Sequence, residues 1–155
     1  RLVPNTGAVA DNDPNTAGTQ LDGTLTYAQG DPNVNATPRV IGSAYTNNDT
    51  DLATGTVIYG IDIATGFLVT QGRSAGAGGT PAAVSPNTGQ LFSVGRLGVN
   101  LVNNLGFDIA PTSNTAYVAS GSRLFTVNLG TGAATSLGTI AVPSGTTLRG
   151  VAVLP

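Results

Sequence analysis

The sequence lacks six residue types, and each absence removes a class of chemistry. Lys, Glu, His, Cys, Met and Trp do not occur among the 155 residues, so all six basic residues are Arg and all eight acidic residues are Asp. Without His or Cys there is no Ser-His or Cys-His nucleophile pair, no imidazole or thiolate metal ligand and no thiol redox centre. Most hydrolases, transition-metal sites and redox enzymes are thereby excluded.

Charge is also scarce. Charged residues make up 9% of the chain, whereas about 25% is usual. The net charge is −2, and the six Arg stand singly along the sequence, so there is no basic stripe for a phosphate backbone. No apolar run approaches the ~18 residues that suggest a membrane span. We therefore expect neither nucleic-acid binding nor membrane insertion.

The composition that remains favours strands. Lys and Glu are strong helix formers, whereas the abundant Thr, Asn, Gly and Val favour strands and turns. Hydrophobic residues account for 40% of the chain, beside 22 Gly and 9 Pro, which is enough apolar content for a folded core. The length is that of one ordinary domain. We expect a single all-β domain over residues 1–155.

A repeat runs through the sequence. Tight turns that contain Thr-Gly separate extended runs at Pro4–Gly7, Ile63–Gly66, Pro86–Gly89 and Leu129–Gly132. Three landmark pairs share a spacing of 43 residues: Thr88 and Thr131, Gly95 and Gly138, and Leu105 and Leu148. A period of about 40 to 45 residues with four short strands is typical of β-propeller blades. The sequence therefore predicts propeller-like, four-stranded antiparallel units.

The strands of these units can be assigned from turn residues and alternation. We predict a regular blade over 99–140, with strands at 106–111, 115–120, 123–129 and 133–140. An irregular blade region covers 39–98, with strands at 40–48, 56–63, 67–71 and from 90, and a Gly-rich linker near 72–85. A hairpin and polar loops occupy 1–38, and 148–155 reads as the first strand of the next blade.

The number of repeats in the chain is not an integer. The chain holds about 3.6 repeats, whereas closed propellers have roughly four to eight blades. Two interpretations remain open: a minimal four-bladed ring closed by its own ends, or an incomplete ring that a partner completes. In the second case, unpaired strand edges must be met by another chain, because exposed flat edges invite pairing.

Several segments carry a family resemblance. RLVPNTG, AYTNN, TVIYGID, GFDIA and RLFTVNLGTGAATSLG resemble the motifs L-N-P-D-T-G, A-Y-T-N-N, L-Y-x-I-D and L-Y-T-V-N-L-A-T-G-A-A-T-x-V-G of a bacterial secreted family of unknown function, in the same order. The resemblance spans nearly the whole chain and corresponds to the C-terminal two-thirds of that family. It implies a propeller-like fold and an extracellular or cell-surface location in bacteria. It carries over no catalytic residue.

One loop has the spacing of a calcium site. In DNDPNTAGTQLD, Asp11, Asp13 and Asn15 alternate and Asp22 stands at the twelfth position. Ca²⁺ prefers six to eight oxygen ligands, which such a loop can supply. Thr16 stands where an EF-hand has Gly, and Asp22 is shorter than the usual Glu. The alternative is a surface loop whose Asx side chains bond their own backbone; calcium is the only cofactor that the sequence suggests.

Other polar residues allow a functional and a structural interpretation. Tyr45 beside Asn47 and Asn48 could stack and hydrogen-bond a sugar, or could pack within a strand. Asp62 and Asp108 lie inside strand-like runs, where a carboxylate can be catalytic or can accept backbone N–H groups. We favour the bracing role for both Asp. The second acidic stretch, at 47–51, is interpreted as a solvated hairpin loop.

We therefore expect a non-enzymatic extracellular structural or interaction module. It would assemble with identical chains or another protein through its strand edges, into a multimer or filament. The first alternative is a calcium-dependent propeller that binds a glycan or mediates adhesion. The second alternative is a polysaccharide hydrolase or lyase that uses carboxylates alone, which requires two Asp side chains facing each other.

Overall fold

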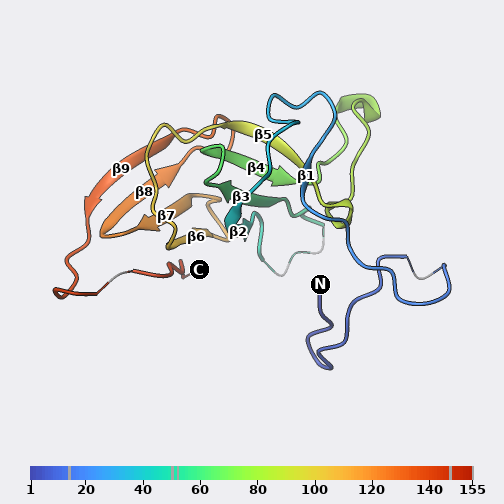
Figure 1. Ribbon diagram of the computed structural model, residues 1–155, viewed down its shortest axis with the longest axis horizontal. Coiled ribbons are helices and arrows are strands. Elements are labelled where there is room, and N and C mark those ends of the chain that lie inside the picture. Colours follow the sequence, from blue (N-terminus) through green and yellow to red (C-terminus); the bar gives the residue numbers. More distant parts are fainter. Residues whose placement is uncertain (14, 50, 52, 147, 155) are drawn as a thin grey trace.

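The computed structural model describes residues 1–13, 15–49, 51, 53–146 and 148–154, and it is all-β (Figure 1). Two sheets hold its nine strands. The first sheet contains β1 (Thr26–Tyr27), β2 (Val40–Tyr45), β3 (Ile58–Asp62), β4 (Phe67–Gln71) and β5 (Gln90–Arg96). The second contains β6 (Leu105–Ile109), β7 (Ala116–Ser120), β8 (Arg123–Val127) and β9 (Ala134–Thr139). Two short 3₁₀ turns, Ala77–Gly79 and Pro86–Thr88, precede β5.

Each sheet is built around a four-stranded antiparallel meander. The second sheet has the order β6-β7-β8-β9, and the first has the order β1-β5-β4-β3-β2, in which β1 is added parallel to β5. Within the described ranges neither sheet closes into a barrel. The all-β prediction is confirmed, and strands β2 to β9 overlap the strands predicted over 40–140. The described residues include no helix of the length and hydropathy needed to cross a membrane.

The two sheets pack on each other through a shared core. Alternation along the strands places apolar side chains of both meanders on the facing surfaces. The buried members of this core are Ala44, Ile61, Leu68, Leu97, Leu105, Phe107, Ile109, Ala116, Val118, Phe125 and Val127. The first strands of the two meanders, β2 and β6, lie in contact. A Cβ on Gly42 of β2 would lie 2.8 Å from Leu105 Cδ1, so glycine permits this close approach.

A second, smaller core lies on the opposite face of the first sheet. Tyr27, Val69 and Leu91 are buried there, against partly buried Leu25, Ala36, Val40 and Phe67. The covering side chains come from the segment 25–40, most of which the sequence predicted to lie in polar loops. This segment thus covers part of the first sheet's outer face.

The two meanders repeat each other in detail. In the first sheet, the β4–β5 register shifts between Leu68, which pairs with Gly95, and Val69, which pairs with Ser93. In the second sheet, the β8–β9 register shifts in the same way after the pair formed by Leu124 and Gly138. Each bulge adds one residue to the fourth strand. The 43-residue spacing of the two glycines therefore corresponds to one structural position in two units.

Equivalent rows of residues cross the two sheets at this position. Gly42, Ile61, Leu68 and Gly95 form a row in the first sheet, and Gly106, Ala119, Leu124 and Gly138 form it in the second. The first row faces the second sheet, and Ile61 and Leu68 are fully buried. The second row lies on the face turned away from the first sheet, the outer face, where Gly106 and Ala119 are buried, Leu124 is half-buried and Gly138 is exposed.

The predicted Gly-rich linker and the C-terminal segment both have defined positions in the fold. The Gly-rich segment is closed by an antiparallel bridge between Arg73 and Val84, whose backbone groups exchange two hydrogen bonds of 2.9 Å. The segment 148–154 runs beside β6, and a Cβ on Gly106 would lie 2.2 Å from Val151 N. It forms no ladder within the described residues. That it begins a further unit stays a prediction, and Pro155 lies outside the described residues.

Candidate functional site

The four residues of the predicted calcium loop are engaged in hydrogen bonds to their own chain. Asp11 Oδ1 accepts bonds from the backbone N–H groups of Asp13 and Gln20, at 3.1 and 3.0 Å. Asp13 accepts bonds from the Thr16 hydroxyl at 2.6 Å and from the Asn15 N–H at 3.0 Å. The Thr16 hydrogen bond holds the pKa of Asp13 below its usual value. These contacts are Asx turns in a surface loop.

The twelfth residue of the loop is paired with a cation. Asp22 accepts bonds from the guanidinium of Arg1, Nε to Oδ2 at 2.9 Å and Nη2 to Oδ1 at 3.0 Å. This pairing lowers the pKa of Asp22. Among the described residues no three acidic side chains gather as a metal-binding group. A calcium ion at this loop stays a prediction, and it would require Asp22 to exchange its Arg1 contact for the ion.

The three residues of the predicted sugar site face different surroundings. Asn47 pairs with Asn114 of the β6–β7 loop: the Asn47 N–H donates to Asn114 Oδ1 at 2.9 Å, and Asn114 Nδ2 donates to Asn47 Oδ1 at 2.7 Å. Both residues have positive φ, at 47° and 52°, which Asn tolerates better than most residues. This amide pair connects one loop of each sheet. Asn48 is exposed.

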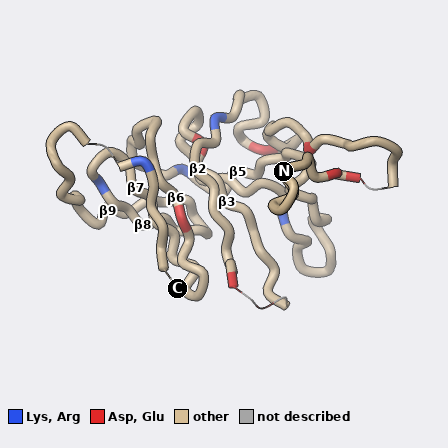
Figure 2. Tube along the Cα trace, turned by 90° about the horizontal axis from the view of Figure 1, so that it is seen from below, with Lys and Arg blue, Asp and Glu red and all other residues tan. Residues whose placement is uncertain are grey.

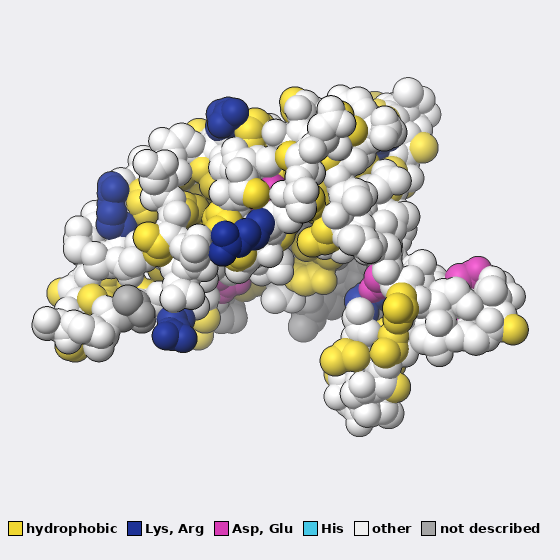
Figure 3. All heavy atoms as spheres, viewed as in Figure 1, with side chains coloured by type: hydrophobic (Ala, Val, Ile, Leu, Met, Phe, Trp, Pro, Cys, Tyr) yellow, Lys and Arg dark blue, Asp and Glu magenta, His cyan; other side chains and the backbone are white. Residues whose placement is uncertain are grey.

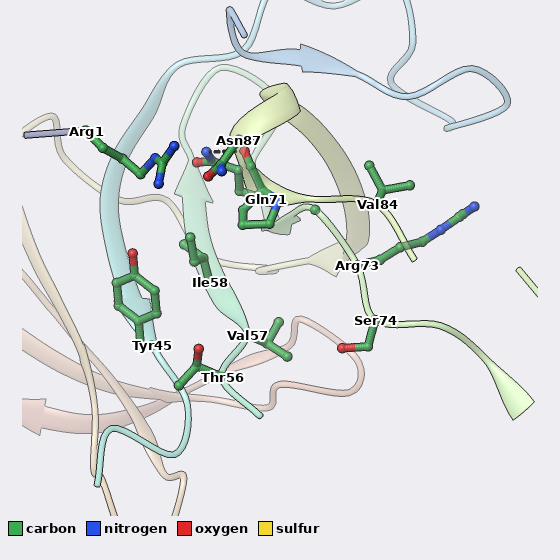
Figure 4. A pocket seen from close by; sticks show the side chains of 12 residues that line it. Arg1, Tyr45, Thr56, Val57, Ile58, Gln71, Arg73, Ser74, Val84 and Asn87 are labelled. Carbon is green, nitrogen blue, oxygen red and sulfur yellow. Dashed lines mark hydrogen bonds between the residues drawn. The ribbon is translucent and has the colours of Figure 1, made fainter. Parts of the chain in front are cut away.

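Tyr45 lies apart from Asn47, at a hollow on the outer face of the first sheet. The hollow has a volume of about 220 Å³, and its lining includes Arg1, Tyr45, Ile58, Gln71, Arg73 and Asn87. Figure 4 shows the Tyr45 ring and the Arg1 guanidinium on one side and the carboxamides of Gln71 and Asn87 on the other. Tyr45 is 49% exposed. The hollow thus offers one aromatic face and several neutral polar groups.

Asp62 is the most deeply buried acid, and it accepts four hydrogen bonds. Tyr27 Oη donates to Oδ2 at 2.5 Å, and Thr65 Oγ1 donates to the same oxygen at 2.9 Å. Oδ1 accepts the backbone N–H groups of Arg39 at 2.9 Å and Ala64 at 2.8 Å. Burial alone would raise the pKa of Asp62, but these bonds outweigh it and the pKa lies below its usual value.

The Asp62 contacts join three separate segments. They tie the end of β3 to the turn that follows it, to the start of β2 and to β1. Burial raises the pKa of Tyr27, and its bond to Asp62 raises it further, so the hydroxyl stays protonated as a donor. Tyr27 itself is 4% exposed. Asp62 therefore holds together three segments of the first sheet, which is the bracing role that we favoured from the sequence.

The remaining carboxylates also have partners within the chain. Asp108 Oδ2 accepts the Val153 N–H at 2.7 Å, which fastens the segment 148–154 to β6. Asp31 accepts the Ser93 N–H at 2.6 Å and hydroxyl at 2.7 Å. Asp49 and Asp51 accept backbone N–H groups of their own loop, at 2.8 and 2.9 Å. Each of the eight Asp thus accepts at least one hydrogen bond from the protein. Figure 2 shows the few charges scattered along the trace.

One close contact between the two meanders involves backbone and glycine alone. The Thr131–Gly132 turn, which precedes β9, rests on Gly95 of β5. A Cβ on Gly95 would lie 2.0 Å from Thr131 O, and a Cβ on Gly132 would lie 2.4 Å from Gly95 O. The Ala134 N–H then donates to Leu97 O at 2.9 Å. We call this contact, in which a Thr-Gly turn rests on a glycine of another segment, a glycine seat.

A second glycine seat precedes the first in the chain. The Thr88–Gly89 turn, before β5, rests on Gly23, just before β1. A Cβ on Gly23 would lie 2.0 Å from Thr88 O, and a Cβ on Gly89 would lie 2.4 Å from Gly23 O. The Gly23 N–H donates to Asn87 O at 2.7 Å. In each meander, the turn before the fourth strand therefore packs against a glycine in the segment that precedes that meander in the sequence.

Sequence reasoning did not identify the glycine seats or the Tyr27–Asp62 pair. The 43-residue spacings of Thr88 to Thr131 and of Gly95 to Gly138 were the available signal for the seats, because they mark turns and strand positions that recur. The Tyr27–Asp62 pair had no such signal, since the two residues are 35 positions apart.

Comparison with known proteins supplies a family. No curated protein and no solved structure matches the chain significantly. Residues 1–152 match one family model, whose description is a domain of unknown function. This range takes in both sheets, both glycine seats and the segment beside β6. The chain therefore belongs to the family described as domain of unknown function DUF4394.

Proposed function

We propose that the protein is a non-enzymatic structural or interaction module, exported by bacteria, whose two meanders are consecutive propeller-like blades of a stack that another chain completes. The observation that carries this proposal is the repeated row of residues. In the first sheet the row through Ile61 and Leu68 is buried by the next sheet, whereas in the equivalent row of the second sheet Ala119 is buried, Leu124 is half-buried and Gly138 is exposed.

The covering of this outer face is partial. The segment 148–154 covers the row at Gly106, over the first strand of the second sheet. Beyond it, Leu124 is half-buried, and on β9 the side chain of Leu137 is 54% exposed. Partly uncovered leucines next to an edge strand are typical of a site of protein association. A further four-stranded unit would cover it as the second sheet covers the first.

The carboxylates support a non-enzymatic role. Acid and base catalysis by Asp alone needs two carboxylates that face a common cavity. Here the eight Asp are distributed among separate turns and braces, and the most buried one, Asp62, accepts four hydrogen bonds. The pKa of Asp62 lies below its usual value, which suits an acceptor and opposes a role as a general acid.

The test is the solution mass of the protein, measured by light scattering over a range of concentrations, with negative-stain images of the same samples. We expect multimers, and we expect Leu137→Asp to dissociate them because it places a charge on the apolar outer face. Leu21→Asp is the matched control, since Leu21 is 70% exposed in the N-terminal loop. A monomer at every concentration that binds no other protein would overturn the proposal.

A second candidate function is glycan binding at the hollow beside Tyr45. It is favoured by the half-exposed aromatic ring, which can stack on a sugar, and by the nearby carboxamides of Gln71 and Asn87. A glycan array, screened with and without a calcium chelator, tests this function and its predicted calcium dependence together. Tyr45→Ala should abolish any signal, and an array without signal would rule out the candidate.

A further inference from the structure

The outer face carries Gly138 at the ladder position in β9 that Gly95 takes in β5, and we call this position the open glycine seat. Its backbone has a positive φ of 123°, which Gly95 does not have. At Gly95 the seat holds the Thr131–Gly132 turn, whereas a Cβ on Gly138 would meet no atom of the described residues within 4 Å. The position after the bulge is thus free to receive a Thr-Gly turn.

The chain also has a Thr-Gly turn, Thr6–Gly7, whose glycine has no described residue packed against it. The N-terminal hairpin reproduces the Thr131–Gly132 turn in its backbone hydrogen bonds. The Gly7 N–H donates to Val3 O at 2.8 Å, as the Gly132 N–H donates to Asn128 O at 2.8 Å. The Thr6 N–H donates to the same carbonyl at 3.2 Å, and the Thr131 N–H does so at 3.3 Å.

A third backbone hydrogen bond is also common to the Thr6–Gly7 and Thr131–Gly132 turns. The Val3 N–H donates to Ala8 O at 2.8 Å, and the Asn128 N–H donates to Ala133 O at 2.9 Å. At the tip, however, a Cβ on Gly7 would meet nothing within 4 Å among the described residues. The seated and the free turn therefore share one backbone conformation, and they differ in whether a strand glycine lies opposite.

The hairpin carries three exposed apolar side chains, and one exposed leucine lies beside Gly138. On the hairpin, Leu2, Val3 and Val9 are 66%, 38% and 47% exposed, and beside Gly138 the side chain of Leu137 is 54% exposed. Figure 3 shows apolar atoms on the small lobe that carries the N-terminal hairpin, below the body of the molecule. An exposed apolar patch such as that of the hairpin is typical of surfaces that bind protein.

The free turn and the open seat lie at opposite ends of the molecule. Figure 1 places the N-terminal hairpin at one end and β9 at the other. Within one copy of this structure they do not meet. We propose that the Thr6–Gly7 turn of a second copy of this chain docks in the open glycine seat at Gly138, an inference that rests on the proposed assembly function.

This docking repeats contacts that the chain makes within itself. Gly7 of the second copy lies against Gly138, as Gly132 lies against Gly95. The Val9 N–H of the second copy donates to the carbonyl of Ile140, which follows Gly138 by two residues, as Leu97 follows Gly95. Because the two docking surfaces differ, the contact is head-to-tail, and its repetition gives a closed ring or an open filament.

Gly7→Asn tests the docking without altering the hairpin. Gly7 has a φ of 68°, which Asn adopts at little cost, and the new Cβ meets nothing in the chain's own structure. In the docked turn the same Cβ would clash with the backbone, as at Gly132, where it would lie 2.4 Å from a carbonyl oxygen. Gly66→Asn is the matched control, because Gly66 occupies the same turn type with a φ of 72° and an unobstructed Cβ.

Sedimentation velocity over a concentration series gives the readout. We expect Gly7→Asn to raise the apparent dissociation constant at least about tenfold, a loss of about 1.4 kcal/mol, and Gly66→Asn to leave it unchanged. Multimers that tolerate Gly7→Asn but not Leu137→Asp would overturn this docking and leave the proposed function standing. A wild-type chain that stays monomeric and binds no partner would overturn both.

The absence of Cys allows a second measurement that does not depend on affinity. Thr6→Cys and Leu137→Cys proteins are mixed with a short bismaleimide. In an equimolar mixture we expect crosslinked dimers that contain one chain of each variant to exceed the sum of the two same-variant dimers. A yield of mixed dimers no greater than that sum, as random pairing gives, would contradict the head-to-tail arrangement.

Discussion

Removal of the Tyr27 hydroxyl tests the bracing role of Asp62. Tyr27→Phe deletes the 2.5 Å hydrogen bond to Asp62 and leaves the ring in the second core, where Tyr27 is 4% exposed. A hydrogen bond to a charged group contributes about 1.5 to 3 kcal/mol. For a domain of this size each kcal/mol corresponds to about 2 to 4 °C in melting temperature, so we expect a decrease of about 3 to 12 °C.

The acid limb of the stability curve gives a second readout of the same variant. The pKa of Asp62 is lower in the folded than in the unfolded chain, where about 3.9 is usual. Its stabilisation is therefore present above about pH 4 and is lost as the pH falls through the folded-state pKa. Tyr27→Phe removes a hydrogen bond that lowers this pKa, so its acid unfolding should begin at higher pH than that of the wild type.

Urea unfolding between acid and neutral pH measures both effects. Tyr59→Phe is the matched control, because burial alone raises the pKa of Tyr59 and no hydrogen bond contributes. The control should lose little stability at any pH. Equal stability losses in the two variants, or an unshifted acid limb in Tyr27→Phe, would refute the assignment of Asp62 as a charged brace.

Three further substitutions test contacts between elements. Gly95→Ala places a Cβ 2.0 Å from Thr131 O. Because the backbone must move to make room, we expect the free energy of unfolding in urea to fall by about 1 to 3 kcal/mol. An unchanged free energy of unfolding would contradict the contact between Gly95 and the Thr131–Gly132 turn. Asn114→Ala breaks the amide pair between the two loops; it should cost about 1 kcal/mol and increase hydrogen exchange in both loops, whereas exchange confined to one loop would argue against coupling. Asp108→Ala removes the acceptor of the Val153 N–H; that amide should exchange faster while the sheet amides stay protected, and unchanged exchange would mean that Asp108 does not hold the segment.

The strands could be predicted from the sequence because their signals are local. The predicted strands at 106–111, 115–120, 123–129 and 133–140 agree with β6 to β9 within one or two residues. Alternating apolar residues and Gly or Asn turns mark each of them. The repeat spacing was informative too, since Gly95 and Gly138 occupy the same bulge position in their sheets.

The partners of single polar residues could not be predicted, because they come from distant parts of the chain. Asn47 was assigned to a sugar site from its neighbours in sequence, but its amide pairs with Asn114, 67 positions away. Asp11 and Asp13 have the spacing of metal ligands, and the same spacing serves Asx turns, in which each carboxylate bonds an N–H two residues on. Spacing alone does not distinguish the two uses.

The most direct measurement is the image of the assembled particle by electron microscopy, from wild-type protein at a concentration where light scattering detects multimers. In the proposed assembly the two sheets are successive units of one stack, so each copy should join the next at the β9 end and the particles should be rings or filaments with a regular repeat. Uniform single particles of monomer size, with the outer face of the second sheet open to solvent, would contradict this account.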